Sequence, residues 1–155
     1  MFMKSIQSLC LIQSILMKTD LSNATFIIPI RIESDDRLRN VVTSIAFLVE
    51  NFDTNIIVKE VDKESIFQTE VLPIFEEILE VDLWKNFHHI FERSEEPLFH
   101  RQRVLNEMIA ECETDIVVNY DCDVILPIKS YELAYKGITE GCLLYTSPSP
   151  RDQCL

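Results

Sequence analysis

Residues 25–60 read TFIIPIRIESDDRLRNVVTSIAFLVENFDTNIIVKE, and this stretch decides the fold. Its first apolar run, Phe26 to Ile30, is short and holds a proline only near its end, which is typical of a buried parallel strand. Residues 35–51 then carry apolar side chains at the spacing of an amphipathic helix, with Ser34 placed to cap its start. The apolar positions are Leu38, Val41, Val42, Ile45, Leu48 and Val49. A second apolar run, Asn55 to Val58, completes a strand–helix–strand unit.

The same alternation continues along the chain. Residues 64–80 predict a second helix, which Pro73 must either start or kink. Residues 87–91 predict a third strand, residues 101–112 a third helix and residues 116–120 a fourth strand. The expected fold class is therefore α/β, with a βαβ-wound, mostly parallel sheet flanked by helices. Ligands of such sheets bind at the carboxyl ends of the strands.

The two ends of the chain differ from its middle. Residues 1–23 are predicted to be an N-terminal extension, either upstream of a native start at Met17 or a targeting segment, and they are too polar to span a membrane. Residues 142–155, CLLYTSPSPRDQCL, have no periodicity and read like a translated sequencing adapter, the alternative being a disordered terminus. The predicted domain is therefore residues 24–141, truncated in mid-fold.

Composition excludes several classes of function. The chain has 155 residues and only two glycines, which rules out Gly-rich phosphate loops. Its formal net charge of −12 argues against nucleic-acid binding, and it implies that a polyanionic ligand needs a divalent cation. The five cysteines are odd in number and irregularly spaced, so we expect a reducing, cytoplasmic setting, free or peripheral to the inner face of the membrane.

The triplet Asp121-Cys122-Asp123 is the strongest candidate site. It follows the fourth predicted strand directly, so both carboxylates can approach one divalent cation if the backbone turns there. Mg²⁺ and Mn²⁺ take oxygen ligands and bridge protein carboxylates to substrate phosphates. The alternative is a solvated acidic turn.

Two further side chains lie at predicted strand ends. Arg31 follows the first strand and suits a phosphate or a nucleobase, the alternative being a surface ion pair with Glu33 or Asp35. Glu60 ends the second strand and suits a uracil N–H or a ribose hydroxyl, with Asp62 as the fallback. The alternative for Glu60 is an exposed strand-end carboxylate.

The stretch Phe99 to Asn106, FHRQRVLN, opens the third helix. Arg101 and Arg103 are two residues apart and cannot share one helix face, so only one of them is expected to reach a ligand. Structural or surface roles are expected for the histidines, which are His88, His89 and His100.

Together these sites resemble those of glycosyltransferases of the GT-A fold, in the same order along the chain. The run Thr25 to Arg31 resembles the first strand of family-2-type transferases and of the β-1,4-galactosyltransferase group. Residues 55–60 look like their second strand, residues 99–106 are similar to a helix start whose Arg faces the nucleotide, and Tyr120-Asp-Cys-Asp123 falls where the metal-binding Asp-x-Asp lies. The resemblance covers residues 24–141 and favours a bacterial family-2-like enzyme.

The resemblance implies a transferase that takes a hexosyl group from a nucleotide sugar, a UDP-sugar, to the hydroxyl of a glycan or other acceptor, with Mn²⁺ or Mg²⁺ as cofactor. The implied contacts are Pro29, Arg31 and Arg101 to the nucleotide, Glu60 to the uridine, Asp121 to the ribose or the metal, and Asp123 to the metal. Glu33 and His100 depart from the galactosyltransferase pattern, which has a basic residue and Asn there. The acceptor site and the catalytic base of this fold follow the Asp-x-Asp strand, so no base is assigned and the truncated chain is expected to be inactive alone.

Two other classes are less favoured. A nucleotidyltransferase would carry a Gly-rich basic loop after the first strand, where this chain has residues 31–36, Arg-Ile-Glu-Ser-Asp-Asp. The other class is a noncatalytic nucleotide-binding α/β module or a receiver-like domain, and a receiver would place acidic residues beside the first strand, where Arg31 stands.

Overall fold

The computed structural model describes residues 18–79 and 86–141, so the predictions for residues 1–17 and for the tail 142–155 lie outside the described part. The chain divides into one unit that ends at Ile125 and a second that begins at Leu126. The first unit contains the sheet and the helices that pack on it. The second contains the described helix α5 (Ile128–Thr139).

The four strands of the sheet all run parallel, in the order β3-β2-β1-β4. They are β1 (Thr19–Ile30), β2 (Phe52–Asp62), β3 (Phe87–Arg93) and β4 (Ile116–Asn119). Consecutive residues of β1, from Phe26 to Ile28, are all buried, as expected for a central strand that is covered on both faces. The α/β class predicted from the sequence is confirmed, and the sheet is wholly parallel.

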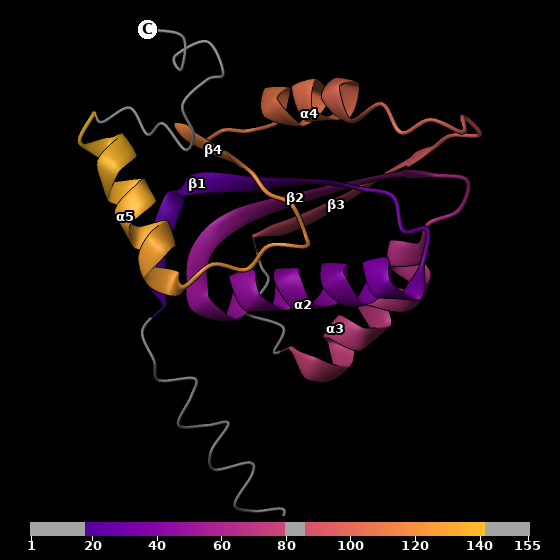
Figure 1. Cartoon of the computed structure of the whole chain (residues 1–155), viewed down its shortest axis with the longest axis horizontal. Helices are drawn as coiled ribbons and strands as arrows, with labels where there is room; N and C mark the ends of the chain where they lie inside the picture. Colours follow the sequence, from indigo (N-terminus) through magenta and orange to yellow (C-terminus); the bar gives the residue numbers. More distant parts are fainter. Residues whose placement is uncertain (1–17, 80–85, 142–155) are drawn as a thin grey trace, which may run out of the picture. The chain divides into compact units, whose positions relative to one another are not determined.

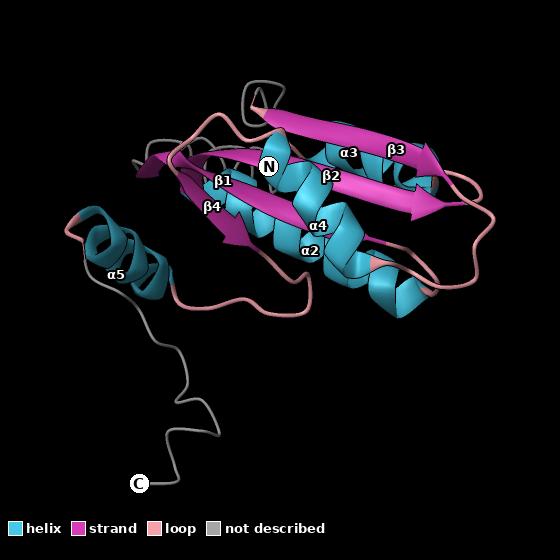
Figure 2. Cartoon of the chain, turned by 90° about the horizontal axis from the view of Figure 1, so that it is seen from above, coloured by secondary structure: helices cyan, strands magenta, loops and turns pink. Residues whose placement is uncertain are grey.

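Helices cover both faces of this sheet. α2 (Asp35–Asn51) and α3 (Leu72–Ile78) lie on one face, and α4 (Arg101–Ala110) lies on the other (Figures 1 and 2). α2 begins and ends where predicted, and Ser34 caps it by accepting a hydrogen bond from the backbone N–H of Arg37 at 3.2 Å. None of the helices among the described residues is long and apolar enough to cross a membrane.

The predicted helix over residues 64–80 is split around Pro73. A π-helical turn, η1 (Phe67–Val71), comes first, and α3 follows with Pro73 in its first turn. The backbone N–H of Leu72 donates to the carbonyl of Phe67, five residues back, which widens the turn just before the proline. Because a proline ring crowds the carbonyl four residues earlier, a wider turn at this point relieves the contact. Pro73 was predicted to start or to kink the helix, and it stands where the helical backbone changes from π to α geometry, in the first turn of α3.

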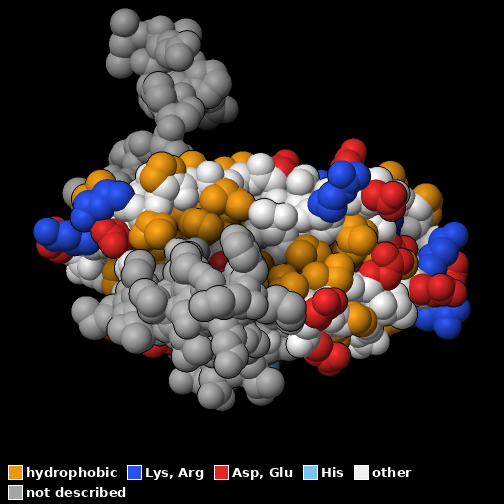
Figure 3. Space-filling model, turned by 90° about the horizontal axis from the view of Figure 1, so that it is seen from below, with side chains coloured by type: hydrophobic (Ala, Val, Ile, Leu, Met, Phe, Trp, Pro, Cys, Tyr) orange, Lys and Arg blue, Asp and Glu red, His pale blue; other side chains and the backbone are white. Residues whose placement is uncertain are grey.

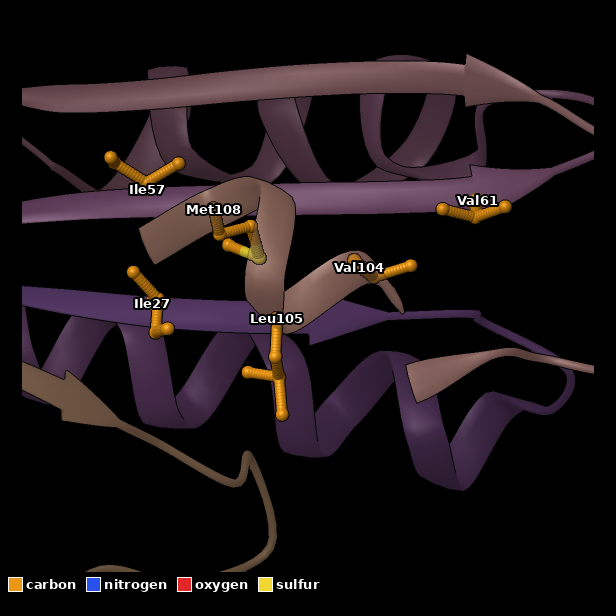
Figure 4. Packing of buried hydrophobic residues seen from close by; sticks show 6 residues of the cluster. All are labelled: Ile27, Ile57, Val61, Val104, Leu105 and Met108. Carbon is orange, nitrogen blue, oxygen red and sulfur yellow. The ribbon is translucent and has the colours of Figure 1, made fainter. Parts of the chain in front are cut away.

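α4 packs on β1 and β2 through a compact apolar cluster. Val104, Leu105 and Met108 of the helix meet Ile27, Ile57 and Val61 of the strands (Figure 4). Val104 and Met108 are fully buried, so the start of α4 is fixed over the carboxyl half of β2. This packing determines where the first residues of α4, including Arg101, stand.

The face that carries α2 and α3 keeps apolar side chains partly exposed among charged ones (Figure 3). Leu38, Val42 and Phe47 of α2 are half-buried, whereas Val41, Ile45 and Leu48 are fully buried. The predicted apolar stripe of α2 is therefore wider than the part that the sheet covers.

Three strands are longer than predicted, β3 by only two residues at its end. β1 begins at Thr19, before the predicted domain start at residue 24, and β2 spans residues 52–62 instead of 55–58. The added residues of β1 are mostly polar, and they are held by cross-strand bonds such as that from Asn55 Nδ2 to the carbonyl of Ser22, at 3.0 Å. Polar strand ends lack the apolar run by which a strand is recognised in sequence.

β4 stops before its neighbour β1 does. Asn119, the last residue of β4, lies opposite Ile27, while β1 continues to Ile30. The N–H of Tyr120 donates to the carbonyl of Ile27 at 3.1 Å, so the odd-numbered residues of β1 turn their backbone groups toward β4. Pro29 lies beyond the end of β4, where its lack of an N–H costs the sheet no hydrogen bond.

α5 was not anticipated from the sequence. Pro127 precedes its first turn, and the backbone N–H of Leu126 donates to the hydroxyl of Tyr131 at 3.2 Å. The helix ends at Thr139, and Gly141 follows the capping residue Glu140 with a φ of 78°, the left-handed conformation that favours glycine after a helix.

Candidate functional site

The winding of the sheet reverses between β1 and β4. From β1 the chain moves to β2 and then to β3, with α2 and α3 on one face, and α4 on the opposite face then returns it to β4 on the far side of β1. In open parallel sheets such a reversal leaves a crevice at the carboxyl ends of the two diverging strands, and ligands bind there. The predicted site residues near this edge are Arg31 after β1 and Asp121 after β4.

A cleft of about 490 Å³ lies at the carboxyl ends of β1, β2 and β3. Its lining residues are Arg31, Ile32, Glu33, Asp62, Lys63, Glu64, Ile66, Ser94, Glu96 and Pro97. Carboxylates outnumber cations in this lining, so a phosphorylated ligand there needs an added cation to neutralise it. Asp62, the fallback to Glu60, is a lining residue, and Glu60 is not.

Arg31 is buried beneath the loop that leads from β3 to α4. Its Nε donates to the carbonyl of Val61 at 2.8 Å and its Nη1 donates to the carbonyl of Pro97 at 3.2 Å. Its guanidinium carbon lies 5.5 Å from the ring centroid of Phe99, a cation–π distance. The alternative of a surface ion pair with Glu33 or Asp35 is wrong, because only 7% of Arg31 is exposed and its bonds go to carbonyls.

The Nη2 atom of Arg31 is buried and has no hydrogen-bond partner within the described residues. A buried N–H without an acceptor costs free energy, about 1–3 kcal/mol for an uncharged group and more for a charged one. Since Arg31 also lines the cleft, an anionic or carbonyl oxygen of a ligand would relieve this cost.

The triplet Asp121-Cys122-Asp123 forms an exposed turn directly after β4. Its backbone is fixed from two sides, because Ser44 Oγ of α2 donates to the carbonyl of Cys122 at 2.6 Å and Tyr120 Oη donates to that of Val124 at 2.7 Å. Burial raises the pKa of the Cys122 thiol to about 12, so this sulfur is protonated near neutral pH. The carboxylates of Asp121 and Asp123 are the groups that the turn offers to a ligand.

Arg101 connects the start of α4 to this turn. Its Nη2 donates to Asn119 Oδ1 at 3.1 Å and forms an ion pair with Asp121 Oδ1. Arg103 turns the other way, toward Glu92 of β3 and Glu107 of α4. The prediction that the two arginines diverge is confirmed, and Arg101 is the one that contacts Asp121.

The chemistry of the turn fits Mg²⁺ or Mn²⁺ better than a metal held by protein ligands alone. No group of three or more His, Cys, Asp or Glu side chains is placed to hold a metal in the part of the chain that the structure describes. Mg²⁺ usually takes one or two carboxylates and completes its shell with waters and substrate phosphates. Asp121 and Asp123 are the two carboxylates that the turn could supply to such a metal, and Asp121 is paired with the guanidinium of Arg101.

Glu60 is neither exposed nor turned toward the cleft. Its carboxylate is fully buried and accepts hydrogen bonds from Ser65 Oγ at 2.5 Å and from the N–H of Phe67 at 3.0 Å. His89 Nε2 lies 3.3 Å from Glu60 Oε2, and the His89 ring stacks on Phe67 at 4.3 Å between centroids. The alternative of an exposed strand-end carboxylate is wrong, and Glu60 instead caps the start of η1.

Two important groups were not identified from the sequence. Ser44 interrupts the buried stripe of α2 between Val41 and Ile45, and a polar residue at such a position is the signal that could have revealed it. The second group joins β2, β3 and α4, and consists of Lys59, Glu92, Arg103 and Glu107. His88 and His100 are exposed, and His89 is structural, as expected for the histidines.

Comparison with known proteins adds no family to these observations. No family model matches the sequence, and no curated protein or solved structure is significantly similar to it.

Proposed function

We propose that this chain binds a nucleotide-sugar donor, a UDP-sugar, through Mn²⁺ or Mg²⁺, for transfer of a hexosyl group to an acceptor hydroxyl. The observation that carries the proposal is the position of the Asp121–Asp123 turn, which follows β4 at the point where the winding of the sheet reverses. The resemblance to GT-A glycosyltransferases supports the same assignment.

The charges around the site agree with a metal-bridged diphosphate. A diphosphate placed beside a cleft rich in carboxylates is repelled unless a divalent cation lies between them. Asp123 would hold the metal directly, and Asp121 would contact it or the ribose. The metal would supply Lewis-acid stabilisation to the departing nucleotide.

The nucleoside part of the donor would occupy the cleft at the ends of β1, β2 and β3. Arg31 offers the unpaired Nη2 to a carbonyl or phosphate oxygen, and Asp62 offers a carboxylate to a ribose hydroxyl or a base N–H. Asp62 takes the role first considered for Glu60, because the Glu60 carboxylate is occupied by Ser65 and Phe67. Pro29 would contact the nucleotide through its ring, because proline has no backbone N–H to donate.

We predict that UDP together with Mn²⁺ raises the melting temperature of the full chain. At free ligand about tenfold above its dissociation constant, linkage stabilises the folded state by about 1.4 kcal/mol. Asp123→Ala should abolish the shift that depends on the metal, because Asp123 is the residue proposed to hold the metal directly. The measurement is differential scanning calorimetry with UDP, with Mn²⁺, and with both.

Asp53→Ala is the matched control. Asp53 is also exposed, but it lies at the start of β2, at the amino ends of the parallel strands, whereas the site lies at their carboxyl ends. The control should keep the full shift. Equal shifts in wild type and Asp123→Ala would refute the metal assignment.

A further inference from the structure

We propose that the guanidinium of Arg101 pairs with Asp121 in the absence of metal, and that it changes partners when a divalent metal binds the Asp121–Asp123 turn. The metal displaces the guanidinium from Asp121, and the released Arg101 then binds the anionic group of the ligand. Metal and anion therefore bind with positive coupling. This inference rests on the proposed function and concerns the regulation of the same site.

The contacts of Arg101 allow its guanidinium to leave the Asp121 carboxylate. Both of its bonds, to Asn119 and to Asp121, are made by Nη2, while Nε and Nη1 have no hydrogen-bond partner within the described residues. The Arg101 side chain is 42% exposed and that of Asp121 is 61% exposed, and ion pairs as exposed as this one contribute little to stability. Breaking the pair therefore opposes metal binding only weakly.

A divalent metal and the guanidinium compete for the same carboxylate. Oδ1 of Asp121 accepts from Nη2, so a metal at that oxygen would stand within contact range of a positive charge. Like charges so close repel strongly outside bulk water, and the guanidinium must move away.

The fold keeps the released guanidinium at the site. Arg101 is the first residue of α4, and Val104, Leu105 and Met108 hold that helix on the sheet, so the side chain moves while its backbone stays. Asn119 Oδ1 is a neutral acceptor that Arg101 can retain after it leaves Asp121.

A hollow of about 550 Å³ lies at the start of α4, lined by Glu96, His100, Arg101, Gln102 and Arg103. His100, at the N-cap position, makes no side-chain hydrogen bond to the first turn, which leaves backbone N–H groups of that turn for an anion. Arg103 does not compete for this role, because its guanidinium binds Glu92 and Glu107.

The test measures binding of Mn²⁺ to the full chain from the electron paramagnetic resonance signal of free Mn²⁺, with and without saturating UDP. We expect Arg101→Gln to bind Mn²⁺ alone about fivefold more tightly than wild type, because the competing charge is gone. In wild type, saturating UDP should tighten Mn²⁺ binding. In Arg101→Gln the factor of tightening should be at least about fivefold smaller, because the residue that couples metal binding to anion binding is lost.

Two variants separate charge from other effects. Arg101→Lys keeps the positive charge, so its affinity for Mn²⁺ alone should stay near that of wild type. Arg39→Gln removes the same charge from an exposed ion pair with Asp36 on α2, and it should change neither quantity by more than about twofold.

The outcomes distinguish this inference from the proposed function. If wild type binds Mn²⁺ and Asp123→Asn does not, but Arg101→Gln binds it no more tightly than wild type, the exchange is refuted and the metal site stands. If neither wild type nor Arg101→Gln binds Mn²⁺, the proposed function and the exchange both fall. If Arg101→Gln binds Mn²⁺ tightly and wild type does not, the exchange is supported.

Discussion

Glu60 is a buried carboxylate that holds three elements together. It joins β2, where it stands, to the start of η1 through Ser65 and Phe67, and to β3 through His89. Burial pushes the pKa of Glu60 upward, but the approach of His89 Nε2 to 3.3 Å and the hydrogen bonds from Ser65 and the Phe67 N–H outweigh burial and hold this pKa below its usual value of 4.5. The charged carboxylate therefore stabilises the folded state.

We predict that Glu60→Gln lowers the free energy of unfolding by about 1–3 kcal/mol at pH 7, because buried donors lose a charged acceptor. A folded-state pKa below the unfolded one stabilises the protein above the unfolded pKa, and this contribution is lost as the pH falls through the folded pKa. The gap between wild type and variant should therefore narrow below pH 4.5. Urea unfolding at a series of values from roughly pH 3 to pH 7 measures the free energy of unfolding of wild type and of Glu60→Gln.

The control for this prediction is Glu50→Gln, a change of the same kind at an exposed position of α2. It should leave the free energy of unfolding nearly unchanged throughout the range. A gap between wild type and Glu60→Gln that stays constant as the pH falls would contradict the role assigned to the charge.

Ser44 acts on the candidate site without being part of it. Its hydroxyl is buried in α2 and holds the carbonyl of Cys122, in the middle of the acidic turn. We predict that Ser44→Ala lowers the free energy of unfolding by about 1 kcal/mol and weakens Mn²⁺ binding, although both carboxylates remain. Ser44→Thr, which keeps the hydroxyl, should restore metal binding. Calorimetry and Mn²⁺ titration give the two readouts.

Thr43→Ala is the neighbouring control, because the Thr43 hydroxyl bonds to the carbonyl of Arg39 within α2 and to no other group in the described part of the chain. Loss of metal binding in Thr43→Ala as well would show that the turn responds to α2 in general and not to Ser44.

At the scale of the elements, α4 is attached to the sheet by charge as well as by apolar contact. Lys59 of β2 binds Glu107 of α4 at 2.6 Å and Glu92 of β3 at 3.1 Å, and Arg103 of α4 binds both carboxylates. The bond from Arg103 holds the pKa of Glu92 below its usual value, and the bond from Lys59 does the same for Glu107. The four charges balance one another, so the largely buried ammonium of Lys59 is neutralised.

We predict that Glu92→Gln and Glu107→Gln each lower the melting temperature slightly, and that the double variant lowers it by more than the sum of the two. Either carboxylate alone can pair with Lys59, whose side chain is 13% exposed, whereas removal of both leaves a buried charge without a partner. A double-mutant cycle by thermal unfolding measures the difference, and additive losses would contradict it. The pair Glu76→Gln and Glu77→Gln on α3 is an exposed control that should be additive.

At the scale of the whole molecule, the sequence predicted what depends on local pattern. The strand–helix order, the cap at Ser34 and the turn after β4 all follow from residues close together in the chain. The polar start of β1 could not be recognised, because its pairing with β2 is a contact between distant residues. α5 was not predicted, although Ile128, Tyr131 and Tyr135 recur at helical spacing.

The candidate site was predictable to the same extent. The positions of Asp121 and Arg31 at strand ends follow from the alternation of elements, and both are found there. The burial of Glu60 was not predictable, because it depends on His89 of β3 and on the start of η1 meeting at one point. The unpaired Nη2 of Arg31 likewise arises only when the loop from β3 folds over it.

The early end of β4 has a consequence for association between chains. An uncovered β edge is a template on which another extended chain can add as a strand, and long edges of this kind lead to aggregation. Residues 28–30 of β1 continue past β4 and have no strand partner on that side among the described residues, but these residues are buried, and Pro29 has no N–H to offer an incoming strand. Burial and the missing N–H of Pro29 together protect this end of β1 against the addition of a further strand.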